Sequence, residues 1–203
     1  IPATMAGALQ HNLLNAMAAV ALADGLHVCT EAINQGLATF ENSLDMNPGR
    51  FNIIYDYPFS VVSDTALSQA SLRRSIDCFM RLPCEGQRLC MISAVGNRPD
   101  CTFDEMADVV AGQFVRYICF ETDYFRRDRQ RGEIARRLSQ ALLAQGVGEA
   151  QIACVETPGD ALMHVKSSAT SPDMVYINAI SPNEFFQAAR PVFANDQGQD
   201  PLQ

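Results

Sequence analysis

The sequence predicts an α/β, Rossmann-like domain whose mainly parallel sheet of about six strands is covered by helices. Short runs rich in β-branched and aromatic residues alternate with longer segments of helical periodicity from residue 51 onward. Only Asp56-Tyr57-Pro58 separates the first two runs, which predicts one antiparallel hairpin, whereas helical segments separate the later runs and predict parallel strands. The 203 residues, 48% of them hydrophobic, are enough to bury a full core, so one domain with a small appendage is expected.

Two amphipathic helices are predicted ahead of the sheet, within residues 1–46, each with an apolar stripe at helical spacing. The stripes consist of Leu13, Leu14, Met17, Val20 and Ala21, and of Ala32, Ile33, Leu37 and Phe40. Asn12 and Thr30 are the expected N-caps. No strand accompanies these helices and the chain begins with Ile1-Pro2, so we expect a piece of a longer protein in which the stripes pack on a preceding domain. The boundary is predicted at Asn47-Pro48-Gly49.

The strands are predicted where the β-rich pattern occurs, in residues 51–55, 59–63, 88–94, 115–120, 151–155 and 174–178. The helices that cover them are predicted near residues 67–81, 103–113, 132–145, 159–166 and 182–189. The α/β domain therefore covers residues 47–193. The Gln- and Asp-rich residues 194–203 form a flexible tail that is expected to fray.

The charge of the chain argues against two classes of partner. Its 15 basic and 23 acidic residues give a net charge of −8, which disfavours a nucleic acid or an anionic membrane surface. No apolar run approaches the roughly 20 residues needed to cross a bilayer, and no charged segment followed by an apolar stretch begins the chain. We therefore expect a cytoplasmic protein with no nucleic-acid and no membrane partner.

The cysteines and histidines do not form a metal-binding or nucleophilic pattern. The 7 cysteines are scattered without a Cys-x-x-Cys pair, and His11, His27 and His164 are far apart in the sequence. An odd, dispersed set of cysteines most simply indicates reduced thiols that serve as small hydrophobic side chains. No metal site and no catalytic residue are predicted in this chain.

Polar side chains are expected to converge at the edge of the sheet where the parallel strands end. They are grouped in Asp64-Thr65, Gly96-Asn97-Arg98, Glu121-Thr122-Asp123 and Asn178. Ligands of open α/β sheets bind beyond the carboxyl ends of the strands. Each group alone is also compatible with a helix cap or a turn. Their shared edge is what predicts a binding site.

Four segments together resemble the C-terminal portion of a Mur-type ligase. They are the run His-Asn-Leu-Leu-Asn-Ala-Met-Ala-Ala at residues 11–19, Pro-Gly-Arg at 48–50, the acid at the end of the second strand, and the arginine-rich residues 127–133. Within that superfamily the last segment is most similar to the cyanophycin synthetases. The resemblance covers roughly residues 1 to 190, and it implies that residues 1–46 are the helical end of a central ATP-binding domain.

The resemblance implies a nucleotide site at four positions. In Mur-type ligases the two Asn of the His-Asn-x-x-Asn-Ala motif and the Arg of Pro-Gly-Arg enclose the adenine, and the acid holds the ribose; here these are Asn12, Asn15, Arg50 and Asp64. Amides can read the adenine edge, a guanidinium can stack on its face, and a carboxylate accepts hydroxyl protons. The alternatives are that both Asn cap a helix and that Arg50 forms a surface ion pair.

The arginine-rich segment is the predicted substrate region. Arg126, Arg127, Arg129 and Arg131 precede a helix that starts near Gly132-Glu133, and cations at a helix N-terminus are unfavourable unless an anion is present. Cyanophycin synthetases carry a similar run, which implies an acidic peptide or amino-acid substrate. The substrate-binding residues implied in this way are Asn97, Arg98, Arg129 and Arg131. The alternative is a solvated loop in which Asp128 and Glu133 pair locally.

Two departures from the family bear on activity. Members usually continue the acid as Asp-Tyr-Ala-His-Asn-Pro, and here Leu67 and Ser68 replace the His and Asn; a second loop, usually Gly-Asp-Arg, has Asn97 in place of Asp. These changes remove groups that position charge during phosphoryl transfer. The chain also lacks a Gly-x-x-x-x-Gly-Lys phosphate loop, since Lys166 is its only lysine. In the family that loop lies upstream, so ATP is the implied cofactor and its Mg²⁺ would be supplied mainly by the upstream domain.

The predicted function is the C-terminal domain of an ATP-dependent, amide-forming ligase that helps to close over ATP and substrate. Its expected partner is the upstream central domain of the same protein, and a homo-oligomer is left open. The alternative is a catalytically degenerate domain that acts as a scaffold or interaction module. Leu67-Ser68-Gln69 favours the scaffold, whereas the intact Arg50 and Asp64 oppose it. A peptidoglycan-type ligase is a weaker third hypothesis, because nothing resembles its Asp-Asn-Pro-Arg substrate motif.

Overall fold

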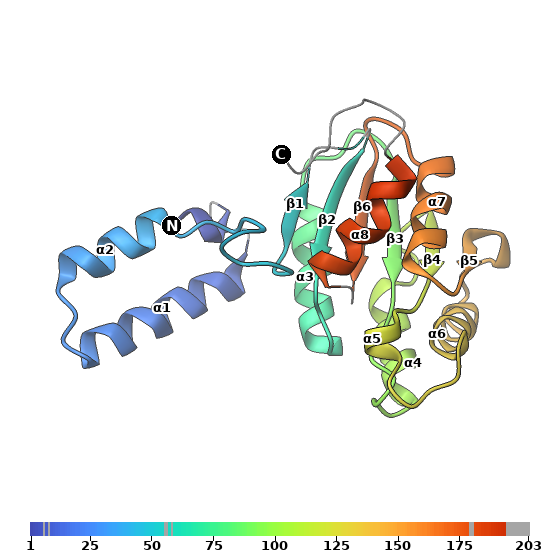
Figure 1. Cartoon of the computed structure of the whole chain (residues 1–203), viewed down its shortest axis with the longest axis horizontal. Coiled ribbons are helices and arrows are strands. Elements are labelled where there is room, and N and C mark those ends of the chain that lie inside the picture. The colour runs from blue at the N-terminus through green and yellow to red at the C-terminus, as the bar shows by residue number, and fades with distance from the viewer. Residues whose placement is uncertain (6, 8, 55–56, 58, 179–180, 194–203) are drawn as a thin grey trace.

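The computed structural model describes residues 1–193 except residues 6, 8, 55–56, 58 and 179–180. Within these residues a 6-stranded sheet has the order β1-β2-β6-β3-β4-β5 (Figure 1). Its strands are β1 (Asn52–Ile54), β2 (Ser60–Asp64), β3 (Arg88–Ile92), β4 (Arg116–Cys119), β5 (Ile152–Cys154) and β6 (Met174–Asn178). β1 is antiparallel to β2, and every other pairing is parallel. The predicted fold class is confirmed, including its single antiparallel hairpin.

Helices cover both faces of the sheet because the strand side chains alternate between two apolar clusters. On one face α3 (Gln69–Arg81), α4 (Cys101–Val110) and α6 (Glu133–Ala144) pack on alternate strand residues such as Val62 and Tyr176. On the other face α7 (Pro158–Ser168) and α8 (Pro182–Phe193) pack on the intervening residues, such as Val61 and Ile177. The remaining short elements are η1 (Pro2–Thr4), α5 (Asp123–Arg126) and η2 (Glu149–Gln151).

The predicted strands and long helices all overlap the observed ones, with ends that differ by up to four residues. α5 was not predicted, because four residues are too few to show helical periodicity. The predicted tail at residues 194–203 lies outside the described residues, as do Asp56 and Pro58 of the predicted hairpin turn. No helix in the part of the chain that is described is long and apolar enough to cross a bilayer.

The first two long helices form a hairpin that projects away from the sheet (Figure 1). α1 (Gln10–Gly25) and α2 (Thr30–Thr39) contain no buried residue, and Leu14 and Met17 are 61% and 60% exposed. The predicted single stripe on α1 is too narrow, because between Leu13 and Ala23 only Asn15 is polar. A helix that is apolar on all sides is normally buried. The hairpin therefore has the surface of an interior element.

The predicted caps of this hairpin are wrong. α1 begins at Gln10 with Leu9 as its N-cap, and α2 begins at Thr30 itself with Cys29 as its N-cap. Leu9 is fully buried in the same apolar cluster as Phe51 and Val62, so tertiary packing sets where α1 starts. Asn12 lies inside the helix, where its side chain donates to the carbonyl of Ala3 at 2.8 Å. The base of the hairpin is thus anchored in the core of the α/β unit.

Candidate functional site

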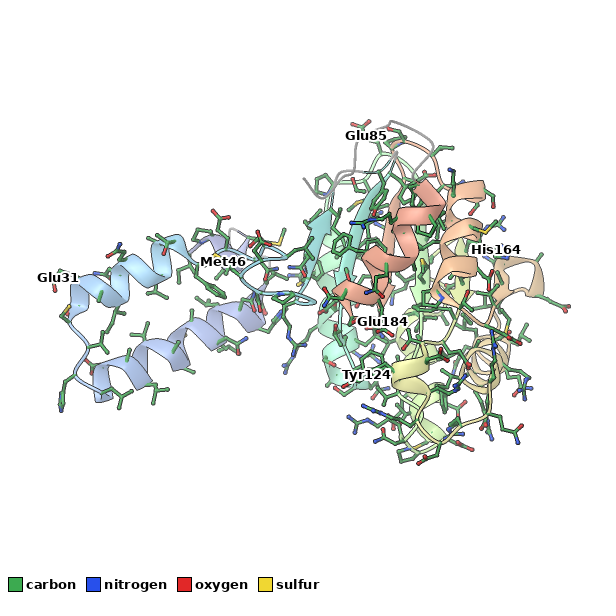
Figure 2. The ribbon with its side chains drawn as sticks, in the orientation of Figure 1. Glu31, Met46, Glu85, Tyr124, His164 and Glu184 are labelled. Atoms are coloured by element: carbon green, nitrogen blue, oxygen red, sulfur yellow. The ribbon has the colours of Figure 1, made fainter. Side chains whose placement is uncertain are left out.

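All of the predicted polar groups lie along one edge of the sheet. The carboxyl ends of the parallel strands meet there, and Arg50 joins them because β1, which it precedes, runs in the opposite direction. In Figure 2, Tyr124 and Glu184 mark this edge and Glu85 marks the opposite edge. Three strand spacings separate the end of β2 from the end of β4, which is roughly 14 Å. The edge therefore has two regions, one at β1 and β2 and one at β3 to β5.

Asp64 is the buried acid of the first region. It ends β2, is 8% exposed, and accepts a hydrogen bond at 2.9 Å from the amide of Thr65. Burial raises the pKa of its carboxyl group, while hydrogen bonds from Ser75, Thr65 and Phe51 and the attraction of His11 act in the opposite direction. The N-cap of the following helix is Ser68, so the alternative role of Asp64 as a helix cap is excluded.

Arg50 lies beside this acid. Its side chain is exposed, and Nη1 donates to the carbonyl of Thr65 at 3.3 Å. Among the described residues it forms no ion pair, so the alternative of a surface ion pair is not found there. A single bond to a carbonyl leaves most of the guanidinium donors and both of its faces available to a ligand.

His11 is a member of the first region that the sequence analysis missed. Burial lowers the pKa of its imidazole; Asp64 counteracts this, and the positive charges of Arg74 and Arg50 add to it. These charges can act on His11 because Leu9, just before α1, packs in the same apolar cluster as Val62 of β2. A signal is present in the sequence, since His11 is the first residue of the His-Asn-x-x-Asn-Ala motif, but the resemblance implies a role only for the two amides.

Asn12 and Asn15 face the groove between α1 and α2. This cavity of about 500 Å³ is lined mainly by apolar residues, with Asn47 as a further amide. The Asn15 amide donates to Oδ1 of Asn12 at 3.5 Å. The structure thus brings Arg50, Asp64 and His11 together and places the two predicted amides next to them, at the base of the hairpin.

The second region is built from two loops in close contact. A Cβ on Gly96 would collide with the carbonyl of Arg126, and the Gly96 amide donates to Phe125 at 2.8 Å. Arg129 fastens the loops: Nε donates to the carbonyl of Gly96 at 2.8 Å and Nη2 to that of Arg98 at 3.0 Å. The first of these loops follows β3 and the second follows β4, so both belong to the same edge.

Acids within the chain neutralise much of the positive charge in this region. Arg129 pairs with Asp100 at 2.7 Å and with Glu133 at 2.8 Å, and hydrogen bonds from Arg129 are the largest cause of a lowered pKa at both carboxylates. Arg131 pairs with Glu156 at 2.9 Å in an exposed position. The predicted local partner Glu133 is therefore present, and a direct contact of Arg129 with substrate would require several of these bonds to be exchanged.

A carboxylate of the same chain binds the N-terminus of α6. Glu121 is 2% exposed and accepts from the amides of Gly132 at 2.8 Å and Ile134 at 3.3 Å. This buried carboxylate offsets the unfavourable charge that the sequence analysis attributed to the preceding arginines. No external anion is needed for the helix to form.

Asn97 and Arg98 are the predicted substrate residues that are exposed and whose side chains have no partner among the described residues. Arg98 forms no ion pair among the described residues. Arg127 was not predicted as a separate member: its guanidinium lies 4.6 Å from the ring centre of the exposed Tyr124, and its φ of 56° is unusual for a residue other than glycine. No spacing rule could have indicated that geometry.

Cys78, Cys90 and Cys119 are buried, as expected for thiols that serve as small hydrophobic side chains, whereas Cys29, Cys101 and Cys154 are exposed, which that expectation did not foresee. Burial raises the pKa of the thiols of Cys78, Cys90 and Cys119. The described residues contain no group of three or more His, Cys, Asp or Glu side chains placed to hold a metal ion.

No protein-family model matches the chain. It is 33% identical over 152 residues to a cyanophycin synthetase of Synechocystis, covering 74% of this chain and 17% of that protein. A cyanophycin synthetase of Trichormus variabilis is 32% identical over 147 residues, covering 72% of this chain and 16% of that protein. The chain thus spans about a sixth of the length of these relatives.

The folds of solved ligases agree with this relationship. MurF from Acinetobacter baumannii superposes with a TM-score of 0.62 at 19% identity over 91% of this chain and 38% of that one. FolC from E. coli, solved with DHPP and ADP, gives 0.62 at 19% identity over 88% and 37%. The chain is related in sequence to the cyanophycin synthetases, and its fold is that of the Mur-type ligases. Its six-stranded sheet matches the C-terminal domain of these ligases.

One departure of this chain from the motif that is usual in Mur-type ligases is conservative in structure. Ser68 is the N-cap of α3: its hydroxyl accepts from the amide of Ser71 at 3.3 Å, and Ser71 caps back in a capping box. Asn and Ser are both strong N-caps, so the exchange of the usual Asn for Ser68 keeps the cap. Leu67 is then the one replacement in this stretch that removes a polar side chain without a structural substitute.

Proposed function

We propose that this chain is the C-terminal domain of an ATP-dependent, amide-forming ligase of the cyanophycin synthetase type, acting together with an upstream central domain of the same protein. The observation that carries the proposal is the convergence of Arg50 and Asp64 at the β1–β2 region, since these residues are separated in the sequence and have no ion-pair partner in the described part of the chain. Use of ATP also favours a cytoplasmic location.

The first region fits an adenosine. Arg50 would stack on the base and orient it, and Asp64 would accept a proton from a ribose hydroxyl. A buried amide next to Asp64 supports a ligand here: Asn178 is the register partner of Asp64, its Oδ1 accepts from the amide of Ala66 at 2.9 Å, and its Nδ2 has no hydrogen-bond partner among the described residues. Buried polar atoms without a partner are uncommon and require an explanation.

The second region fits an acidic substrate through fewer residues than the sequence indicated. Arg98 and Asn97 would bind a carboxylate directly, because their side chains are exposed and unpaired in the described structure. Arg129 would act by shaping the loop that presents them, and Arg131 would contribute through its surface pair with Glu156. When bound, ATP supplies the phosphoryl group that activates a carboxyl group for attack by an amine, and Mg²⁺ is assigned mainly to the upstream domain.

The test uses the complete ligase. Arg50→Ala removes the stacking cation and Asp64→Ala removes the ribose acceptor, and loss of a charge-assisted hydrogen bond corresponds to a decrease of about 10- to 150-fold in ATP-dependent amide formation. Arg73→Ala is the matched control, because Arg73 is also an exposed arginine and pairs with Asp108 on α4. Normal activity in both site variants would reject this proposal.

A scaffold without catalysis is the second candidate, and the apolar Leu67 is the observation that favours it. In a scaffold, Arg50→Ala and Asp64→Ala would leave the activity of the complete protein unchanged. Replacing Leu67 by His tests the same point from the other side. A gain of activity in Leu67→His would mean that loss of this side chain weakened a working ligase.

A further inference from the structure

The turn that carries Arg50 has an unusual backbone. Gly49 and Phe51, on either side of Arg50, have φ values of 70° and 53°. Glycine adopts this left-handed region readily, but a bulky side chain does so rarely. Phe51 is 1% exposed and packs in the core. Such a conformation persists only where the surrounding structure imposes it.

Asn52 is the residue that imposes this backbone conformation on the turn. Its Oδ1 accepts from the amide of Gly49 at 2.7 Å and from that of Arg50 at 3.3 Å. Its Nδ2 donates to the carbonyls of Asn42 and Asn47, both at 3.1 Å. The side chain is 1% exposed and uses both of its donors and both acceptor positions. No apolar residue could hold the two amides in this way.

Two further asparagines close the network. Asn42 donates to the carbonyl of Phe51 at 2.8 Å, and Asn47 donates to Oδ1 of Asn42 at 2.9 Å. We call Asn42, Asn47 and Asn52 the asparagine latch. It fastens the segment between the helical hairpin and the sheet, near Met46 in Figure 2, to the start of β1. The predicted boundary at residues 47–49 is therefore held by specific bonds.

We propose that Asn52 is a positioning residue for nucleotide binding, which holds the Arg50 turn in its binding geometry before the ligand arrives. The proposal rests on the proposed role of Arg50. The latch fixes the backbone amide of Arg50, and the bond from Nη1 to Thr65 then directs the side chain toward the Asp64 side of the edge. A turn ordered in advance spares the ligand the entropy of ordering it, so affinity for ATP depends on Asn52 although Asn52 is buried.

The test compares steady-state kinetics of the complete ligase with ATP as the varied substrate. Asn52→Ala is expected to raise KM for ATP about tenfold while kcat at saturating ATP changes less than about twofold, the pattern of a loss of uniform binding. In the Arg50→Ala background the same change should raise KM less than about twofold further, because Asn52 acts through Arg50. Equal effects of Asn52→Ala in both backgrounds would overturn the proposal.

Asp173→Ala is the matched control for general loss of stability. Asp173 is also buried, at 6% exposed, and accepts from the amides of Gln87 at 2.7 Å and Thr170 at 2.8 Å, but it lies at the opposite edge of the sheet. The Asp173→Ala substitution should lower thermal stability and leave KM for ATP unchanged. An equal rise of KM in Asp173→Ala would show that the effect of Asn52 is only structural, which contradicts the proposal.

The two proposals fail in different ways. If Arg50→Ala leaves KM for ATP unchanged, the proposed function fails. If Arg50→Ala raises KM for ATP and Asn52→Ala does not, only the proposed positioning role of Asn52 is rejected. Asn42→Ala carries the same comparison if the alanine variant of Asn52 does not fold, because it removes the bond to the carbonyl of Phe51 and leaves the bonds from the amides of Gly49 and Arg50 to Asn52 in place. That variant should keep most of the affinity for ATP, and a KM as high as that of Arg50→Ala would contradict the proposal.

Discussion

The two regions of the carboxyl edge handle charge in opposite ways. At β1 and β2 the backbone is fixed by neutral asparagines, and the two charged side chains, Arg50 and Asp64, have no ion-pair partner among the described residues. At β3 to β5 the loops are fixed by the charges themselves, through Arg129 and its two acids. An arginine that builds a loop has few donors left for a ligand. Position at an edge is therefore a weaker indication of binding than the number of unused donors.

The largest loss of stability is expected from a substitution at the contact between the two loops of the second region. Gly96→Ala should destabilise the protein by about 3 kcal/mol, because the added methyl group meets the backbone carbonyl of Arg126 and not a movable side chain. Chemical denaturation would measure the change. Gly36→Ala is the matched control: its added methyl group meets nothing within 4 Å in α2, and it should stabilise the helix by up to about 1 kcal/mol. A tolerated Gly96→Ala would mean that the loops are not held in contact.

A smaller loss of stability is expected for Arg129 than for Gly96, and a smaller one still for Arg131 in the same region. Arg129→Ala should cost about 2 kcal/mol of unfolding free energy, since it removes bonds to two carbonyls and two carboxylates from a side chain that is 16% exposed. Arg131→Ala should change stability by less than about 0.5 kcal/mol, because its pair with Glu156 is at the surface. Arg129→Lys should recover only part of the loss, because an ammonium group cannot reach both loops. Equal losses for Arg129→Ala and Arg131→Ala would remove the distinction drawn here between a structural and a surface arginine.

The smallest change in stability is expected from the ionisation of Asp64, the buried acid of the first region. Because burial raises the pKa of Asp64 above its ordinary 3.8, the folded state holds the proton more tightly than the unfolded state. Ionisation of Asp64 therefore subtracts stability as the pH rises from its ordinary pKa through its folded pKa, and the loss persists at neutral pH. Asp64→Asn should relieve this loss, so its unfolding free energy relative to the unmodified protein should be higher at pH 7 than at pH 3. The opposite trend would show that hydrogen bonds to the carboxylate outweigh its burial.

Much of the fold could be predicted because its signals are local. The strand at residues 174–178 was predicted to the residue, since a short apolar run between turn-forming residues leaves little freedom in its ends. The caps at Asn12 and Thr30 failed because Leu9 is drawn into the core and moves the start of α1. At that position tertiary packing outweighs the capping preference of the residues.

The candidate site was predictable only in part, because its decisive contacts are made by groups that no periodicity marks. Arg50 and Asp64 were found through a motif, whereas Asn52 bonds to the backbone of its neighbours and leaves no pattern in the sequence. The acids that occupy Arg129 come from two segments that are 33 residues apart, which explains why a run of arginines suggested an open anion site. His11 shows the converse, since it belongs to a motif, but its proximity to Asp64 is visible only in the fold.

The exposed hairpin also affects how this chain would behave as a separate polypeptide. Residues 9–40 contain two acids and neither lysine nor arginine, whereas residues 47–193 contain all 15 basic residues and 17 of the 23 acids, a net charge of only −2. The hairpin thus presents an apolar surface next to a unit that is close to neutral. Association through Leu14, Leu22 and Leu26, which are 61%, 66% and 69% exposed, should therefore be driven by burial of apolar surface and depend little on ionic strength. The state of assembly would then depend on protein concentration, through the apolar surface of the hairpin.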